Sequence, residues 1–345
     1  MEELLPKDNE NILPFPDGPV VPSEPQGFLP EQMVRCEECL RANPPTRVTC
    51  IYCAASLPAS ESTANLQKPT LRPLEKWELG YNCIVTGKFP DSLNDETLAQ
   101  VTSFLKLGGD DLKRILASAP LPLARAATPE EASLVDKRLE ALGVETVTIG
   151  DKDLGVDQPP IRVRAAELDE TSVTMHPLGG RGPCCINWSD LVLLVLGRLT
   201  SKRVELKERK AGRRENEILD TSEFFSDELV ADIYRQGELI NFRIVASSFD
   251  FSCLGYGKSL ISGENLTALI QVVREKAPQA AYDNSYDSMR QALEPVWPSE
   301  QQIESRGWRR ERPGKYTTGE SVETTNEGQF LRYSRLRYYL RTTAR

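Results

Sequence analysis

The sequence predicts a multi-domain α+β protein with a small cysteine-rich module, a compact domain and a larger domain. Three observations support this fold class. Two Cys-x-x-Cys pairs lie close together near the N-terminus. Residues 75–152 alternate between strand-like runs and apolar residues at helical spacing. Strand-like segments then recur between residues 160 and 300, where a helical segment follows them.

Composition limits the classes of function. The chain has 345 residues, enough for two or three domains. Its 42 Lys and Arg stand against 51 Asp and Glu, so a nucleic-acid site has to be a local basic patch. The single histidine, His176, excludes chemistry that needs several histidines. No run of about 18 apolar residues and no secretory leader is present, so we expect a cytoplasmic protein without membrane contact.

Two segments have the composition of unstructured chain. Residues 1–32 are rich in proline, and their acidic residues are opposed only by Lys7. This composition predicts a disordered acidic leader, either a plain solvated tail or a segment that docks on a partner. Residues 59–74 are rich in Ser, Thr and Pro and are predicted to be a linker.

Residues 33–58 contain the strongest motif of the chain. Its cysteines follow the pattern C-x2-C-x10-C-x2-C, and they are Cys36, Cys39, Cys50 and Cys53. Two such pairs present four thiolates to one ion, which suits tetrahedral Zn²⁺ in a closed, structural site. Two disulfides are the alternative, but nothing in the sequence indicates an oxidising compartment. We therefore predict a structural zinc site.

The stretch CEECLRANPPTRVTCIYCAASL resembles the short zinc ribbon found at the termini of bacterial proteins. Asn43-Pro44 and Leu57 stand where that pattern has them. The spacing is also similar to the Ran-binding-protein type of zinc finger, some members of which bind single-stranded RNA and others ubiquitin. The glycines that usually follow each cysteine pair in that type are Leu40 and Ala54 here. We expect no internal repeat in the chain.

Residues 75–152 predict the order β-α-α-β-α-β. The clearest helix start is Thr128-Pro129-Glu130-Glu131, with a Thr N-cap, a Pro at the first position and a Glu three residues after the cap. One stretch resembles the C-terminal domain of the bacterial ribosomal stalk protein, a fold that the Clp protease adaptor shares. Its sequence is LKRILASAPLPLARAATPEEASLVDKRLEALGVETVTI. The resemblance implies a small protein-docking domain, whose first two helices would carry Lys106, Lys113 and Arg114.

Residues 160–300 predict a larger α+β domain, for which a pleckstrin-homology-like barrel is one candidate. Strand-like runs are followed by a helix in which Leu266, Leu269, Ile270 and Val273 share one face. The acidic residues between Asp220 and Asp232 are spaced as they would be on one solvated face of a helix.

Residues 301–345 are predicted to form a basic, aromatic tail. Arginine and lysine neutralise phosphates, and aromatic rings stack on unpaired bases. The candidate nucleic-acid residues are Arg306, Trp308, Arg309, Arg310, Arg312 and Lys315. In the alternative interpretation, Tyr333, Arg337 and Leu340 pack as a C-terminal helix onto the preceding domain, or the tail neutralises the acidic leader.

These features favour a non-enzymatic cytoplasmic adaptor that binds protein partners and needs no small-molecule substrate. The motivation is the closed four-thiolate site, the resemblance to a docking fold, and a sequence without a recognisable catalytic motif. The second hypothesis is an RNA- or ribosome-associated protein that uses the basic tail and the zinc ribbon.

Overall fold

The structure is a computed structural model that describes residues 27–58, 71–86, 95–211, 217–305, 307, 309–312 and 315–343. Side chains within 207–220 and 308–318 fall outside this description. The predicted leader and linker lie almost wholly outside the described residues. The chain divides into two compact units, Met1–Gln67 and Lys68–Arg345. No described helix has the length and apolar character needed to cross a bilayer.

The first unit is small and is built around its cysteines. Its elements are the 3-10 helix η1 (Pro30–Gln32) and the strands β1 (Val34–Arg35) and β2 (Ala42–Asn43), which pair antiparallel. Its buried apolar residues are few, and among the described residues they are Cys36, Pro45, Val48, Cys50 and Leu57. A module with so small a core depends on cross-links or a metal for stability.

The second unit begins with a three-stranded antiparallel sheet and three helices. In chain order these are β3 (Tyr81–Val85), α2 (Asp95–Leu105), α3 (Gly109–Ala117), β4 (Pro122–Ala126), α4 (Pro129–Ala141) and β5 (Thr146–Gly150). The strand order is β4-β3-β5. Helix α4 starts as the capping pattern indicates, because the Thr128 hydroxyl accepts a hydrogen bond from the Glu131 amide at 3.2 Å. The element order along 81–150 is therefore strand, helix, helix, strand, helix, strand.

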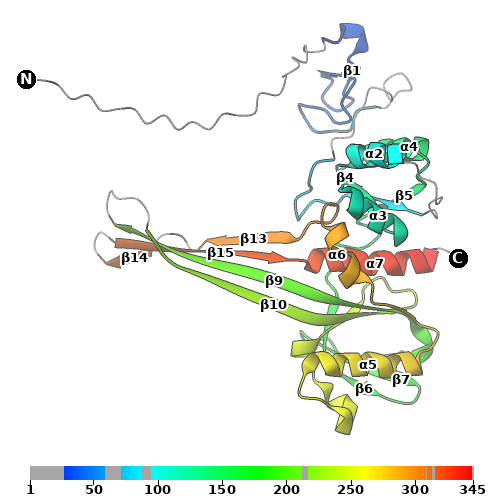
Figure 1. Ribbon diagram of the computed structural model, residues 1–345, viewed down its shortest axis with the longest axis vertical. Helices are drawn as coiled ribbons and strands as arrows, with labels where there is room; N and C mark the ends of the chain where they lie inside the picture. The colour runs from blue at the N-terminus through cyan, green and yellow to red at the C-terminus, as the bar shows by residue number, and fades with distance from the viewer. Residues whose placement is uncertain are drawn as a thin grey trace, which may run out of the picture. The chain divides into compact units, whose positions relative to one another are not determined.

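A ten-stranded sheet organises the rest of the unit (Figure 1). Its strands are β6 (Ile161–Leu168), β7 (Ser172–Pro177), β8 (Cys184–Asn187), β9 (Leu191–Ala211), β10 (Glu217–Arg235), β11 (Phe242–Val245), β12 (Ala281–Asp283), β13 (Glu300–Ser305), β14 (Arg309–Arg312) and β15 (Lys315–Thr325). The main order is β13-β15-β9-β10-β11-β6-β7-β8. Among the described residues the end strands β13 and β8 do not pair with each other, so the sheet is open where a barrel was one candidate.

Helices cover the two faces of this sheet. The remaining helical elements are η2 (Trp188–Asp190), η3 (Ala246–Ser248), η4 (Phe251–Gly257), α5 (Ser262–Lys276), α6 (Tyr286–Leu293) and α7 (Glu327–Thr343). Helix α5 packs on one face through Leu266, Leu269, Ile270 and Val273. Helices α6 and α7 pack on the other face, in a core that also includes residues of β3, α3 and α4. Residues 81–150 and the large sheet therefore share one hydrophobic core.

Helix α7 lies in the core of the second unit and carries many buried polar side chains. Arg335 is fully buried and donates hydrogen bonds to backbone carbonyls, among them that of Gln158 at 2.6 Å. Arg332 lies 3.6 Å from Glu300, and Arg337 lies 2.6 Å from Asp283. Residues 327–343 of the predicted tail therefore form a helix that packs inside the second unit, which agrees with the alternative interpretation of the tail.

The acidic stretch from Asp220 to Asp232 lies on strand β10, so the prediction of a helix face was wrong. Its acids recur about every four residues, which imitates helical spacing, but β10 pairs with β9 along its length. Asp232 is buried rather than solvated. Both of its oxygens accept hydrogen bonds from Arg243, its direct partner on β11, at 2.7 and 2.8 Å.

The outer parts of β9, β10, β13 and β15, with β14, form a projection that we call the arm (Figure 1). Its shaft comprises residues 201–206, 221–228, 300–305 and 319–325. Its tip comprises residues 207–211, 217–220, 309–312 and 315–318. Strand pairing across the arm joins segments more than a hundred residues apart, such as Val204 and Val322.

Candidate metal centre

The four cysteines predicted to bind metal come together in the first unit. The sulfur atoms of Cys36, Cys39, Cys50 and Cys53 all lie within 4.8 Å of one another. The Sγ atoms of Cys36 and Cys53 are 3.6 Å apart, and those of Cys39 and Cys50 are 3.5 Å apart. Tetrahedral coordination with metal–sulfur bonds of about 2.3 Å requires sulfur–sulfur distances of about 3.8 Å. The cluster is thus compatible with one metal ion such as zinc.

The two cysteine pairs sit on two copies of one hairpin. Residues 34–43 and 48–57 share the pattern Val-x-Cys-x-x-Cys at an offset of fourteen residues. In the first hairpin the Cys36 amide donates to the Arg41 carbonyl, and in the second the Cys50 amide donates to the Ala55 carbonyl. The expectation of no internal repeat was therefore wrong. The repeat escaped notice because only the valine and the cysteines are identical.

Each hairpin requires a left-handed residue directly after its second cysteine. Leu40 and Ala54 both have φ of 59°. Their amides donate to the carbonyls of Cys36 and Cys50 at 2.9 and 3.0 Å, which closes the turn around the sulfur atoms. Left-handed backbone is strained for residues with a Cβ, whereas glycine adopts it without this strain.

Neighbouring side-chain and backbone groups donate hydrogen bonds to a sulfur atom of the cluster. The buried Asn43 side chain donates to the Cys50 sulfur at 3.4 Å, and the Tyr52 amide donates to the same atom at 3.4 Å. Burial raises the pKa of the Cys50 thiol, but the donors from Tyr52, Cys53 and Asn43 outweigh it and lower that pKa to about 6. Such donors stabilise a thiolate, the form that binds metal. The sequence pattern did not identify Asn43 in this role.

The second hairpin presents an exposed apolar tip. Ile51 and Tyr52 are 50% and 52% exposed, and they lie between the two cysteines of their pair. The Arg41 guanidinium stacks 4.7 Å from the centre of the Tyr52 ring. The equivalent positions of the first hairpin are Glu37 and Glu38, which are exposed and charged. The repeat therefore gives one module with an apolar and an acidic tip.

The candidate nucleic-acid residues lie at the arm tip or outside the described residues. Arg306 and Trp308 are outside the description. Arg309, Arg310 and Arg312 lie on β14, and Lys315 begins β15. The register places Arg310 opposite Tyr316, which is itself opposite Lys210 of β9. Pairing thus joins the candidate segment to a second basic segment, 207–211, and nucleic-acid binding by these residues stays a prediction.

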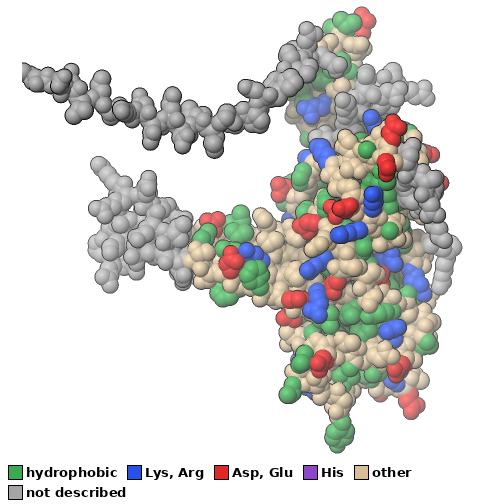
Figure 2. Space-filling view, in the orientation of Figure 1, with side chains coloured by type: hydrophobic (Ala, Val, Ile, Leu, Met, Phe, Trp, Pro, Cys, Tyr) green, Lys and Arg blue, Asp and Glu red, His purple; other side chains and the backbone are tan. Residues whose placement is uncertain are grey.

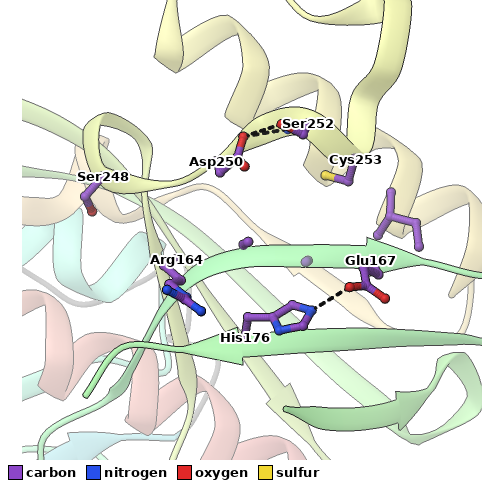
Figure 3. A pocket seen from close by; sticks show the side chains of 10 residues that line it. Arg164, Glu167, His176, Ser248, Asp250, Ser252 and Cys253 are labelled. Atoms are coloured by element: carbon purple, nitrogen blue, oxygen red, sulfur yellow. Dashed lines mark hydrogen bonds and ion pairs between the residues drawn. The ribbon is translucent and has the colours of Figure 1, made fainter. Parts of the chain in front are cut away.

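A pocket of about 860 Å³ lies beside β6 and β7 in the second unit (Figure 3). The His176 ring is 2.9 Å from a Glu167 oxygen, so the single histidine of the chain is held by a carboxylate. Cys253 also lines this pocket. Burial is the main reason that the pKa of its thiol is raised, so the thiol is protonated at neutral pH. The sulfur is therefore not an activated nucleophile.

Comparisons with models of protein families, with curated proteins and with solved structures found no match to this chain. The resemblance of residues 75–152 to the stalk-protein domain therefore stays a prediction. The four-sulfur cluster is the site that the described geometry defines most closely.

Proposed function

We propose that this chain is a non-enzymatic bacterial adaptor protein of the cytoplasm, in which a structural zinc ion orders residues 33–58 as a docking module. Four thiolates complete a tetrahedral shell and leave no coordination position for a substrate. Soft sulfur ligands in this geometry favour zinc over the hard cations. The role of the metal would be to supply the folding free energy that the small core of the module lacks.

The exposed tip of the second hairpin is the observation that carries this proposal. Apolar side chains are exposed at Ile51 and Tyr52 although the module has few apolar residues to spare for its core. The metal and the closed turn hold the tip rigid, so a partner that binds it does not have to order it first. Tyrosine and arginine, as in the Tyr52–Arg41 pair, are common anchors of protein interfaces. Residues 75–152 would add a second docking surface, as their resemblance implies.

The internal repeat supplies a matched test. The zinc-loaded full-length chain and two variants serve as bait in lysate of the source cells. One variant carries Ile51→Ser and Tyr52→Ser, and the other carries Glu37→Ser and Glu38→Ser at the equivalent positions. We expect specific partners whose affinity for the first variant, measured with purified components, falls at least about tenfold. The second variant should bind within about twofold of the parent, since its apolar tip is intact.

Two results would count against the adaptor proposal. One is a set of partners that binds the Ile51/Tyr52 variant as tightly as the parent chain. The other is a turnover that depends on a defined side chain, for instance in the pocket that contains His176.

A second candidate function, RNA association, is favoured by the strand register at the arm tip. The basic segments 207–211 and 309–315 are almost a hundred residues apart in sequence, and β15 pairs with the strands that carry both of them. A local basic cluster in an acidic chain would bind phosphates in a salt-dependent way. Replacing Arg309, Arg310 and Arg312 by glutamine should weaken RNA binding and reduce its salt dependence. Unchanged binding would argue against this function.

A further inference from the structure

A β-bulge between β6 and β7 turns an arginine toward the pocket that contains the single histidine. The register pairs Val163 with Pro177 and Ala165 with His176, so Arg164 is the extra residue of the bulge. Val163 is buried in the core under α5, whereas Arg164 is exposed. Directly paired residues point to the same face of a sheet, so Ala165 and His176 share the outer face. Figure 3 shows the Arg164 side chain beside the His176 ring.

Both carboxylates that line the pocket already have partners. The Glu167 Oε1 atom lies 2.9 Å from the Nε2 atom of His176. The Asp250 carboxylate accepts hydrogen bonds from the amide and the hydroxyl of Ser252, at 3.0 and 2.6 Å. It also lies 3.8 Å from the ammonium group of Lys258. The hydrogen bonds from Ser252 lower the pKa of Asp250, so this carboxylate is ionised at neutral pH.

Arg164 is the charged group of the pocket that lacks such a partner. Among the described residues, no carboxylate lies within ion-pair distance of its guanidinium, and no acceptor lies within hydrogen-bond distance of it. On the face of the second unit seen in Figure 2, by contrast, acidic and basic side chains lie close together. A guanidinium in a pocket without an acidic neighbour can bind the two oxygens of a carboxylate or a phosphate.

The charges around the pocket favour a ligand with a single negative charge. Glu167 and Asp250 border the pocket, so a phosphate dianion would meet repulsion from both while gaining one guanidinium. A carboxylate carries only the one charge that Arg164 can balance. The volume of about 860 Å³ is far more than a carboxylate group fills. The remaining lining includes apolar side chains, namely Ala165, Ala166 and Leu168.

We propose that this pocket binds a small organic monocarboxylate. Its carboxylate pairs with the Arg164 guanidinium, and its apolar body lies over Ala165, whose small side chain leaves room between Arg164 and His176. A few polar groups that orient the ligand within a partly apolar pocket are typical of small-molecule sites. The site belongs to the second unit and does not depend on the cysteine cluster of the first.

The single histidine of the chain provides the readout. With isotope-labelled histidine, the imidazole NMR signals of the zinc-loaded full-length chain report on His176 alone. The chain is titrated at neutral pH with benzoate and hexanoate, and with benzamide and hexanamide as uncharged controls. We expect a saturable shift with at least one carboxylate, with a dissociation constant of about 1 mM or lower. Its amide and inorganic phosphate should each bind at least about tenfold more weakly.

Two arginines of β6 provide a matched pair of variants. Arg164→Gln should weaken binding of the carboxylate at least about tenfold. Arg162 is also exposed but does not line the pocket, so Arg162→Gln should bind within about threefold of the parent. Ala165→Phe keeps every charge and fills the space beside Arg164, so it should abolish binding. Parent-like unfolding of each variant, followed by circular dichroism, guards against local misfolding.

Several results would overturn the proposal. A parent chain whose His176 signals show no saturable shift with either carboxylate, up to about ten times the expected dissociation constant, has no such site. Amides that bind as tightly as the carboxylates would show that Arg164 does not recognise a charge. Binding that survives Arg164→Gln, or that Arg162→Gln weakens equally, would use another group. Phosphate that binds more tightly than both carboxylates would overturn the preference for a single charge.

Discussion

The ion pair between Asp232 and Arg243 is expected to respond very differently to single and double substitution. Both side chains are fully buried, and they face each other across β10 and β11 with hydrogen bonds of 2.7 and 2.8 Å. Arg243 also lies 3.1 Å from Glu327 of α7, and its guanidinium is 5.0 Å from the centre of the Phe330 ring. The pair therefore joins the large sheet to the C-terminal helix.

Removing one partner leaves the other as an unpaired charge in a fully buried site. A buried charge that loses its partner costs about 3–5 kcal/mol of unfolding free energy. Arg243→Met should fall in that range, because Asp232 then has to protonate or remain unpaired. Asp232→Leu should fall at its lower end, about 3 kcal/mol, because Arg243 keeps its contact with Glu327. The double variant Asp232→Leu, Arg243→Met should cost less than either single one, since no unpaired charge remains.

Urea unfolding of the full chain, followed by circular dichroism at neutral pH, measures these differences. The signal of the first unit is kept constant by saturating zinc. The reasoning predicts a coupling free energy of at least about 2 kcal/mol between the two sites. Additive effects of the two single substitutions, or single effects below about 1 kcal/mol, would refute it.

Three further predictions concern the metal, the turns and pH. A chelator should unfold residues 33–58 and leave the second unit folded, as residue-resolved hydrogen exchange would reveal, because the two units have separate cores; loss of protection in both would contradict this. Ala54→Gly and Leu40→Gly should each relieve left-handed strain of about 0.5–1 kcal/mol and raise zinc affinity roughly two- to fivefold in a chelator competition; weaker binding would argue against the strain. Burial acts to raise the pKa of Asp283, but hydrogen bonds from Ser285 and the charge of Arg337 outweigh it and hold that pKa below its usual value. Its contribution is therefore present above the ordinary pKa of about 4 and is lost as pH falls through the lowered value. Asp283→Asn should destabilise the protein at pH 7, and this effect should shrink as pH falls through the lowered pKa.

The sequence predicted features that depend on neighbouring residues. The four sulfur ligands follow from spacing within eighteen residues, and the start of α4 follows from Thr128 and the residues just after it. These signals are local, so they can be recognised in the sequence without knowledge of the tertiary fold.

The features that the sequence did not predict depend on distant pairing. Strand β10 carries charges at helical spacing, and only its pairing with β9 and β11 decides its conformation. The arm requires β15 to pair with a strand more than a hundred residues earlier. Arg332 and Arg335 count as basic tail residues in the sequence, yet both are buried in the structure. No local pattern marks an arginine whose partners are backbone carbonyls elsewhere in the chain.

The position of α7 has a consequence for how the chain acquires its fold during synthesis. This helix leaves the ribosome after every element that it contacts, and Arg335 reaches back to Gly155, 180 residues earlier. Until then the core between the two sheets lacks Phe330, Tyr333 and Leu336 and stays open to water. A nascent chain that stops before residue 327 therefore keeps an exposed apolar surface, the kind of surface that chaperones and proteases recognise.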